Sequence, residues 1–131
     1  MEKIRILGKT TTYTYDKPSF EMLDWFKSPS NIKYMIFLKC PEFTSLCPKT
    51  GQPDFAEILI DYIPDKKCVE SKSLKLYLFS YRNFGEFHEA CVLRIAEDII
   101  KAIHPIYIRV EGKFNPRGGI SIHPIVERGK K

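Results

Sequence analysis

Residues 86–105 read EFHEACVLRIAEDIIKAIHP, and this stretch decides the class of fold that the sequence predicts. Apolar side chains return about every fourth residue, at positions 87, 91, 95, 99 and 103. This period is that of an α-helix with one buried face. His104-Pro105 ends the pattern, because proline lacks the N–H group that a helix interior needs. We therefore expect a helix from about Glu86 to Ile103.

A second, shorter helix is predicted just upstream. From Ser71 onward, Leu74, Leu78 and Tyr81 recur at helical spacing. A serine at position 71 or 73 suits the N-cap, where its hydroxyl can accept from a free backbone N–H group. The run Asn83-Phe84-Gly85 then ends this helix.

Two predicted strands precede the helices and two follow them. The first pair is Asn31 to Lys39 and Phe55 to Ile63, and the second is Tyr107 to Phe114 and Gly119 to Val126. The resulting order, ββααββ, favours an α+β fold with an antiparallel sheet. Such a sheet has two open edges, which favours assembly into a larger sheet or barrel; the alternative is a monomer with short, charged edges.

The remaining N-terminal segment, residues 1–30, is predicted to be an irregular arm with one short helix from Phe20 to Phe26. The chain has 131 residues, of which 44% are hydrophobic, so we expect one domain, 1–131, with a modest core. Its longest apolar runs are far shorter than the roughly 20 residues of a spanning helix. The N-terminus has no apolar signal region, so a cytoplasmic protein without membrane contact is expected.

Charge and cysteine usage narrow the function classes. The net charge is +5, but the basic residues are scattered along the chain. This pattern favours a solvated surface or attraction to a phosphorylated small molecule over direct nucleic-acid binding. The four cysteines show no CxxC spacing, so reduced thiols without a structural metal are expected, although an irregular zinc site stays open. No Rossmann or P-loop glycine pattern occurs.

The segment between the first two predicted strands, residues 43–55, reads FTSLCPKTGQPDF. With its flanks it makes a connection of about 15 residues, and ordered loops of that length are often functional. Cys47 lies on one turn and Asp54 follows the next, so a nucleophile and an acid/base group could come within reach of each other. The alternatives are a buried structural thiol and ordinary turn chemistry at Pro53-Asp54.

Three further stretches carry polar groups suited to a ligand. Residues 69–75, VESKSLK, place a carboxylate, hydroxyls and ammonium groups at a helix start, where phosphates bind or where a capping box forms. His88-Glu89 offers a donor and a carboxylate, or an ordinary polar face. Arg117-Gly118-Gly119 suits a phosphate clamp or an ordinary turn.

Together these stretches resemble a known family. The segments CPEFTSLCPKTGQPDF from position 40, VESKSLKLY from 69, FHE from 87 and GKFNPRGGISI from 112 resemble the NADPH-dependent 7-cyano-7-deazaguanine reductases, the nitrile reductases of queuosine biosynthesis, in their short single-module form. The resemblance implies a tunnelling fold of ββααββ subunits. Its pentameric rings stack as barrels, with active sites between subunits.

The resemblance also implies a reaction and a set of site residues. It is the four-electron reduction of the nitrile to an aminomethyl group with two NADPH, in which Cys47 forms a covalent thioimide and Asp54 gives a proton. The implied substrate residues are Val69, Glu70, Ser71, His88 and Glu89. The implied cofactor residues are Ser71, Lys72, Arg117 and Gly118, with no catalytic metal.

Two other classes stay open beside the reductase. One is a tunnelling-fold enzyme with other pterin or deazapurine chemistry, such as a cyclohydrolase, which would need metal ligands. The other is a non-catalytic RNA-binding module, prompted by the basic charge, whose binding would be sensitive to salt. A reversible disulfide between Cys47 and Cys91 is a further hypothesis, because Cys91 lies on the helix that carries His88.

Overall fold

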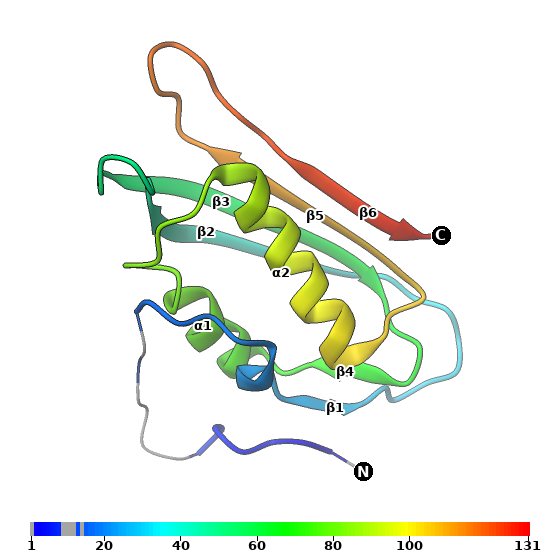
Figure 1. Ribbon diagram of the computed structural model, residues 1–131. Coiled ribbons are helices and arrows are strands. Elements are labelled where there is room, and N and C mark those ends of the chain that lie inside the picture. The colour runs from blue at the N-terminus through cyan, green and yellow to red at the C-terminus, as the bar shows by residue number, and fades with distance from the viewer. Residues whose placement is uncertain (1, 9–12, 14) are drawn as a thin grey trace.

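The computed structural model describes residues 2–8, 13 and 15–131 (Figure 1). In chain order the elements are η1 (Phe20–Met22), β1 (Trp25–Lys27), β2 (Ile36–Leu46), β3 (Pro53–Ile63), β4 (Lys67–Val69), α1 (Ser71–Phe79), α2 (His88–Ile103), β5 (Tyr107–Phe114) and β6 (Ile125–Gly129). The four long strands form one antiparallel sheet in the order β2-β3-β5-β6. This confirms the predicted α+β class and the order ββααββ.

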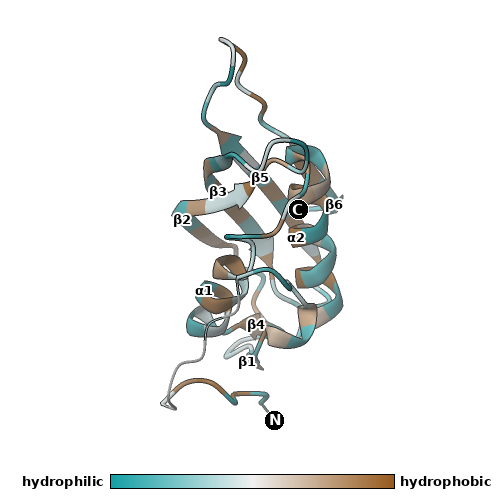
Figure 2. Ribbon diagram, turned by 60° about the vertical axis from the view of Figure 1, so that its left-hand side comes forward, coloured by the Kyte–Doolittle hydropathy of each residue, from teal (hydrophilic) through white to brown (hydrophobic). Residues whose placement is uncertain are grey.

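The helix α2 packs across the four-stranded sheet and forms the core with it (Figure 1). Its buried side includes Val92, Ile95 and Ile99, while its hydrophilic side is turned away from the sheet in Figure 2. Each isoleucine buried in this way stabilises the fold by roughly 1.5–3 kcal/mol. The close approach depends on Gly112 of β5, because a Cβ atom there would lie 2.6 Å from Val92 Cγ2.

The prediction of a long loop between the first two strands is wrong. Strand β2 runs on to Leu46 and β3 begins at Pro53, so only residues 47–52 connect them. The register of β2 shifts between Cys40 and Phe43, at Pro41. A β-bulge accommodates a proline, which has no N–H group for the ladder, and lets the strand continue beyond it.

Several predicted boundaries also differ. The short N-terminal helix is only the 3-10 turn η1, and residues 25–27 instead form β1. The last strand starts at Ile125, because residues 117–120 form a turn and Pro124 cannot donate to a ladder. The prediction of α2 is confirmed to within two residues, and it ends at His104 in the left-handed conformation with φ 46°.

A second, two-stranded sheet was missed by sequence reasoning. Here β1 pairs antiparallel with β4, with Trp25 opposite Val69. The pairing is continued by a hydrogen bond from the Glu70 N–H group to the Asp24 carbonyl, of 2.9 Å. This small sheet therefore fixes where α1 begins.

Candidate active site

Cys47 follows β2 directly and lies in a tight turn. Its N–H group donates to the Gln52 carbonyl and its own carbonyl accepts from Gly51 N–H, each at 2.9 Å. Gly51 has φ +71°, a conformation that a glycine adopts without strain. The end of β2 is held in turn by the α1–α2 connection, because Leu46 exchanges hydrogen bonds with Phe84 and Glu86. The position of Cys47 is thus set by backbone contacts on two sides.

The surroundings of the Cys47 sulfur favour the thiolate. A hydrogen bond from the Thr50 hydroxyl, then the N–H groups of Thr50 and Lys49, then the Arg117 side chain lower the pKa of Cys47 to about 6. A thiol with such a pKa is mostly ionised at neutral pH and is a strong nucleophile. Cys40 shows the contrast, since burial raises its pKa to about 11.

Asp54 is the second residue of β3, and its side chain is only 4% exposed. Its Oδ1 atom lies 3.3 Å from Arg117 Nη1, and its Oδ2 atom lies 3.9 Å from His88 Nδ1. A buried carboxylate needs such partners. The His88 ring is held in turn by stacking on Phe114, with the ring centroids 3.8 Å apart and the planes at 9°.

The structure therefore brings four of the predicted site residues together, namely Cys47, Asp54, His88 and Arg117. They come from the turn after β2, from β3, from the start of α2 and from the β5–β6 connection. Glu89 follows His88 on α2 and is exposed. Sequence reasoning did not predict that Thr50 bonds to the Cys47 sulfur or that Gln52 bonds to Arg117, because it interpreted both residues only as part of a turn. The hydroxyl three residues after the cysteine is the signal that it could have used.

The other predicted residues cluster at the start of α1. Glu70 is buried, and its carboxylate accepts from Lys72 N–H at 2.9 Å and Ser73 N–H at 2.8 Å. Glu70, rather than Ser71 or Ser73, is thus the N-cap of this helix. Because a carboxylate already occupies these amides, the predicted phosphate contact to the helix start itself is disfavoured. Ser71 is exposed and Lys72 Nζ lies 3.4 Å from the Ile6 carbonyl.

A cavity of about 280 Å³ lies between β2 and α1. Ser71 lines it, together with three cationic side chains, Lys39, Lys75 and Arg82. The carboxylate of Glu42 and apolar side chains of both elements complete the lining. This cavity has the mixed apolar and cationic character that suits a phosphorylated ring compound.

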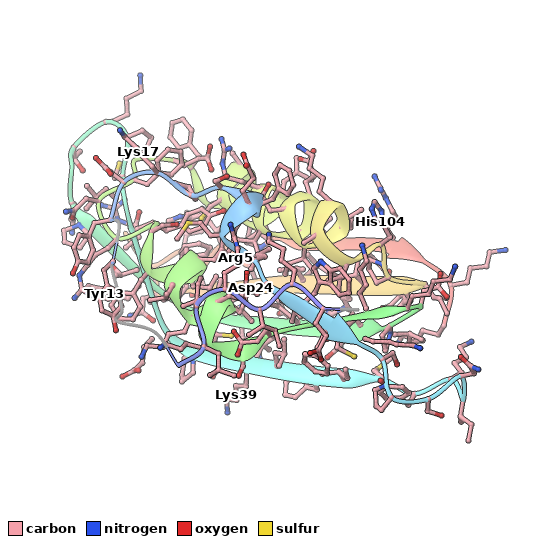
Figure 3. The ribbon with its side chains drawn as sticks, turned by 90° about the horizontal axis from the view of Figure 1, so that it is seen from below. Arg5, Tyr13, Lys17, Asp24, Lys39 and His104 are labelled. Carbon is pink, nitrogen blue, oxygen red and sulfur yellow. The ribbon has the colours of Figure 1, made fainter. Side chains whose placement is uncertain are left out.

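The N-terminal arm is fastened beside Glu70 by Asp24, which is fully buried. The Asp24 carboxylate accepts from the backbone of Arg5 and Ile6 at 2.7 and 3.1 Å, and from Arg5 Nε at 3.1 Å. Figure 3 shows Arg5 and Asp24 next to each other. Asp24 N–H also lies 2.9 Å from Ser73 Oγ, so arm and helix start form one bonded unit.

The two clusters do not meet within one chain. The Glu70 cluster lies at the start of α1, whereas the Cys47 cluster lies beyond its far end, where Leu46 bonds to Phe84. The helix of nine residues between them spans about 13 Å. Figure 1 shows the β2–β3 turn and the start of α1 well apart.

The cysteines are all free thiols, with Cys91 fully buried in the core. The Cys47–Cys91 disulfide stays a hypothesis. No three His, Cys, Asp or Glu side chains converge on a metal position in residues 2–8, 13 and 15–131. Over the same ranges, no helix has the length and apolar character that a membrane crossing requires.

An α+β chain in which a thiol of lowered pKa and a buried carboxyl group share the neighbour Arg117 defines a candidate thiol-dependent enzyme. Comparison with known proteins then assigns the family. The model of the QueF-like protein family matches residues 53–131. The chain is also 58% identical, over 99% of its length and 79% of the relative, to the NADPH-dependent 7-cyano-7-deazaguanine reductase of Bacillus licheniformis (strain ATCC 14580). The chain belongs to the QueF-like family.

Further relatives agree with this assignment. The protein of the same name from Bacteroides thetaiotaomicron is 57% identical over 98% of this chain and 85% of its own length. Among solved structures, the crystal structure of the archaeosine synthase QueF-Like in the apo form matches with a TM-score of 0.66 and 26% identity. That match covers 80% of this chain and 99% of the other. The curated relatives thus share the family with this chain, and the solved structure shares its fold.

Proposed function

We propose that this chain is an NADPH-dependent oxidoreductase that reduces the nitrile of 7-cyano-7-deazaguanine to 7-aminomethyl-7-deazaguanine, in the cytoplasm, for queuosine biosynthesis. The observation that carries the proposal is the Cys47 thiol, whose pKa is lowered to about 6 at the turn that joins it to the buried Asp54. The names of the relatives support the same substrate and cofactor.

The first step follows from the chemistry of a nitrile, which is a poor hydride acceptor. The Cys47 thiolate adds to the nitrile carbon, so a C–S bond forms while one π bond of the nitrile opens. The electron pair of that bond goes to the nitrogen, which takes a proton from Asp54. The product is a covalent thioimide on Cys47, and covalent addition divides one difficult reduction into easier steps.

NADPH supplies the hydrides when it is bound, and four electrons require two NADPH for each nitrile. The residues proposed to hold it are Ser71, Lys72, Arg117 and Gly118. The cationic cavity lined by Ser71 fits a phosphorylated cofactor. Gly118 fits as well, because a Cβ atom built there would meet nothing within 4 Å, so its backbone is open to approach.

Val69, Glu70, Ser71, His88 and Glu89 are proposed to bind the substrate. The exposed carboxylate of Glu89 suits the N–H donors of the aminopyrimidine edge. His88, whose Nδ1 atom lies 3.9 Å from Asp54 Oδ2, is proposed to relay protons in the second reduction. The substrate is a free base, so no contact with nucleic acid is required.

The separation of the two clusters supports a site shared between subunits of a homo-oligomer, proposed to be stacked pentameric rings. The open edges of β2 and β6 are where neighbouring sheets could join. A shared site of this kind would place the Glu70 cluster of one subunit against the Cys47 cluster of the next.

The decisive experiment measures loss of NADPH absorbance after addition of the cyano-deazaguanine. We expect two NADPH consumed for each nitrile. The Cys47→Ala variant should show no turnover and no covalent adduct by intact mass, whereas Cys40→Ala, which removes a thiol of raised pKa, should retain both. An adduct that persists in Cys47→Ala would exclude Cys47 as the nucleophile.

A further inference from the structure

The Arg117 backbone is held by a tight turn. Arg117 N–H donates to the Ile120 carbonyl at 2.9 Å, and Ile120 N–H donates back to Arg117 at 3.1 Å. Gly118 and Gly119, between them, have φ of +59° and +79°. Two successive residues of positive φ define a type I′ turn, which glycines adopt without a steric cost. The turn therefore presents the Arg117 side chain from a defined backbone.

The Arg117 guanidinium reaches from this turn to the connection between β2 and β3. Its Nη1 atom lies 3.3 Å from Asp54 Oδ1, and its Nη2 atom donates to Gln52 Oε1 at 2.5 Å. The backbone carbonyl of Gln52, in turn, accepts from Cys47 N–H. A hydrogen bond from Arg117 also helps to lower the pKa of Cys47. The planar Arg117 guanidinium thus contacts residues at both ends of the connection between β2 and β3.

We propose that Arg117 is a positioning residue of the reaction itself, which holds the Cys47 sulfur in its charged form and orients the Asp54 carboxyl group, as a role separate from cofactor binding. The proposal deepens the proposed function, since it rests on Cys47 as the nucleophile.

The other groups around Cys47 do not supply a permanent positive charge. The Thr50 hydroxyl and the N–H groups of Lys49 and Thr50 are neutral and belong to the same turn. His88, from α2, faces Asp54 and carries a charge only when it is protonated. Among the described groups that act on the thiol, Arg117 is the one permanent cation.

The test uses the free, full-length protein and iodoacetamide as the probe. The alkylation rate of the Cys47 peptide is followed by mass spectrometry between about pH 4.5 and about pH 9, a range that brackets the Cys47 pKa of about 6. We expect Arg117→Met to slow alkylation at pH 6 by about fivefold and to move the midpoint upward, because less of the thiol is ionised. Arg117→Lys should keep most of the wild-type rate, since it retains the charge.

The matched control is Lys49→Met, which removes a cation from the same turn but keeps its N–H group. Its midpoint should equal that of the wild type. An unchanged midpoint in Arg117→Met, or an equal shift in Lys49→Met, would overturn the proposal. Iodoacetamide needs neither NADPH nor the nitrile, so this result is independent of whether the proposed reaction occurs, and a residue that only bound cofactor would leave it unchanged.

Discussion

The residues Cys47 and Cys91 show how much the surroundings of a thiol decide its chemistry. Cys91 is fully buried in the core, and this burial raises its pKa far above the ordinary range of a thiol. Cys47 faces hydrogen-bond donors, and its pKa is lowered to about 6. Composition alone cannot separate the two, because the difference arises from donors that the fold brings to one sulfur and not to the other.

The first prediction concerns pH. Because the reactive form of Cys47 is the thiolate, kcat/KM should rise as pH rises through about 6, the folded-state pKa of the thiol. The Thr50 hydroxyl is the largest cause of the low pKa, so Thr50→Val should move this acid limb to higher pH. Initial rates against pH provide the measurement. Thr50→Ser keeps the hydroxyl and should leave the acid limb of the pH–rate profile at the wild-type pH. An acid limb that does not move in Thr50→Val would contradict the inference that the Thr50 hydroxyl lowers the pKa of Cys47.

The second prediction concerns Asp54 as the proton donor. Asp54→Asn keeps the size of the side chain but has no carboxyl proton to give, so the rate should fall by about 10²–10⁴-fold. Binding of the nitrile substrate, measured by calorimetry, should persist. Asp61→Asn, a change of the same kind on the same strand, is the control and should retain activity. A loss below about tenfold in Asp54→Asn would point to another donor.

At the scale of elements, the sequence was most informative where one period ran for a long stretch. The pattern from Phe87 to Ile103 predicted α2 closely, and β5 was predicted at its observed bounds of Tyr107–Phe114. The first strand was predicted to end at Lys39, whereas β2 continues through a bulge next to Pro41 to Leu46. The three-residue strands β1 and β4 were missed since such short segments show no period.

The third prediction compares two buried serines on different elements. Ser45 of β2 lies opposite Asp54, and its buried hydroxyl meets only the weakly hydrogen-bonding thiol of Cys91, with no oxygen or nitrogen partner among the described groups. Ser45→Ala should therefore raise the thermal midpoint by about 3 °C, as expected when a poorly paired buried hydroxyl that costs about 1 kcal/mol is removed.

Ser73 of α1 is the matched control for this change. Its hydroxyl donates to the Glu70 carbonyl at 2.7 Å and lies 2.9 Å from Asp24 N–H. Ser73→Ala leaves the Asp24 N–H group unpaired, whereas the Glu70 carbonyl still accepts from Leu74 N–H at 3.1 Å. The change should therefore lower the free energy of unfolding by about 1–3 kcal/mol. Both variants are compared by thermal unfolding at one protein concentration. A Ser45→Ala variant destabilised as much as Ser73→Ala would mean that Ser45 has a partner in solution.

At the scale of the whole molecule, the sequence placed Cys47 on a turn, His88 on α2 and Arg117 on the β5–β6 connection, but it could not group them. Arg117 and Cys47 are far apart in the chain, and they meet because β3 pairs with both β2 and β5. Conversely, Glu70 and Cys47 seemed to belong to one site, yet α1 separates them. Sheet pairing and helix packing are long-range properties, so local patterns carry little information about either.

The last prediction tests whether neighbouring subunits complete each other's sites. Two inactive variants are co-expressed: Cys47→Ala, and Ser71→Arg, whose bulk fills the cavity beside α1. If each site takes Cys47 from one subunit and Ser71 from the next, random mixing leaves both intact in about a quarter of the sites. About a quarter of the wild-type NADPH consumption should then return, with mixing verified by native mass spectrometry. Co-expression of Cys47→Ala with Asp54→Asn, two changes in one cluster, should restore none. If co-expression of Cys47→Ala with Ser71→Arg also restores no NADPH consumption, each site lies within a single subunit. A conformational change would then be needed to bring the two clusters of that subunit together.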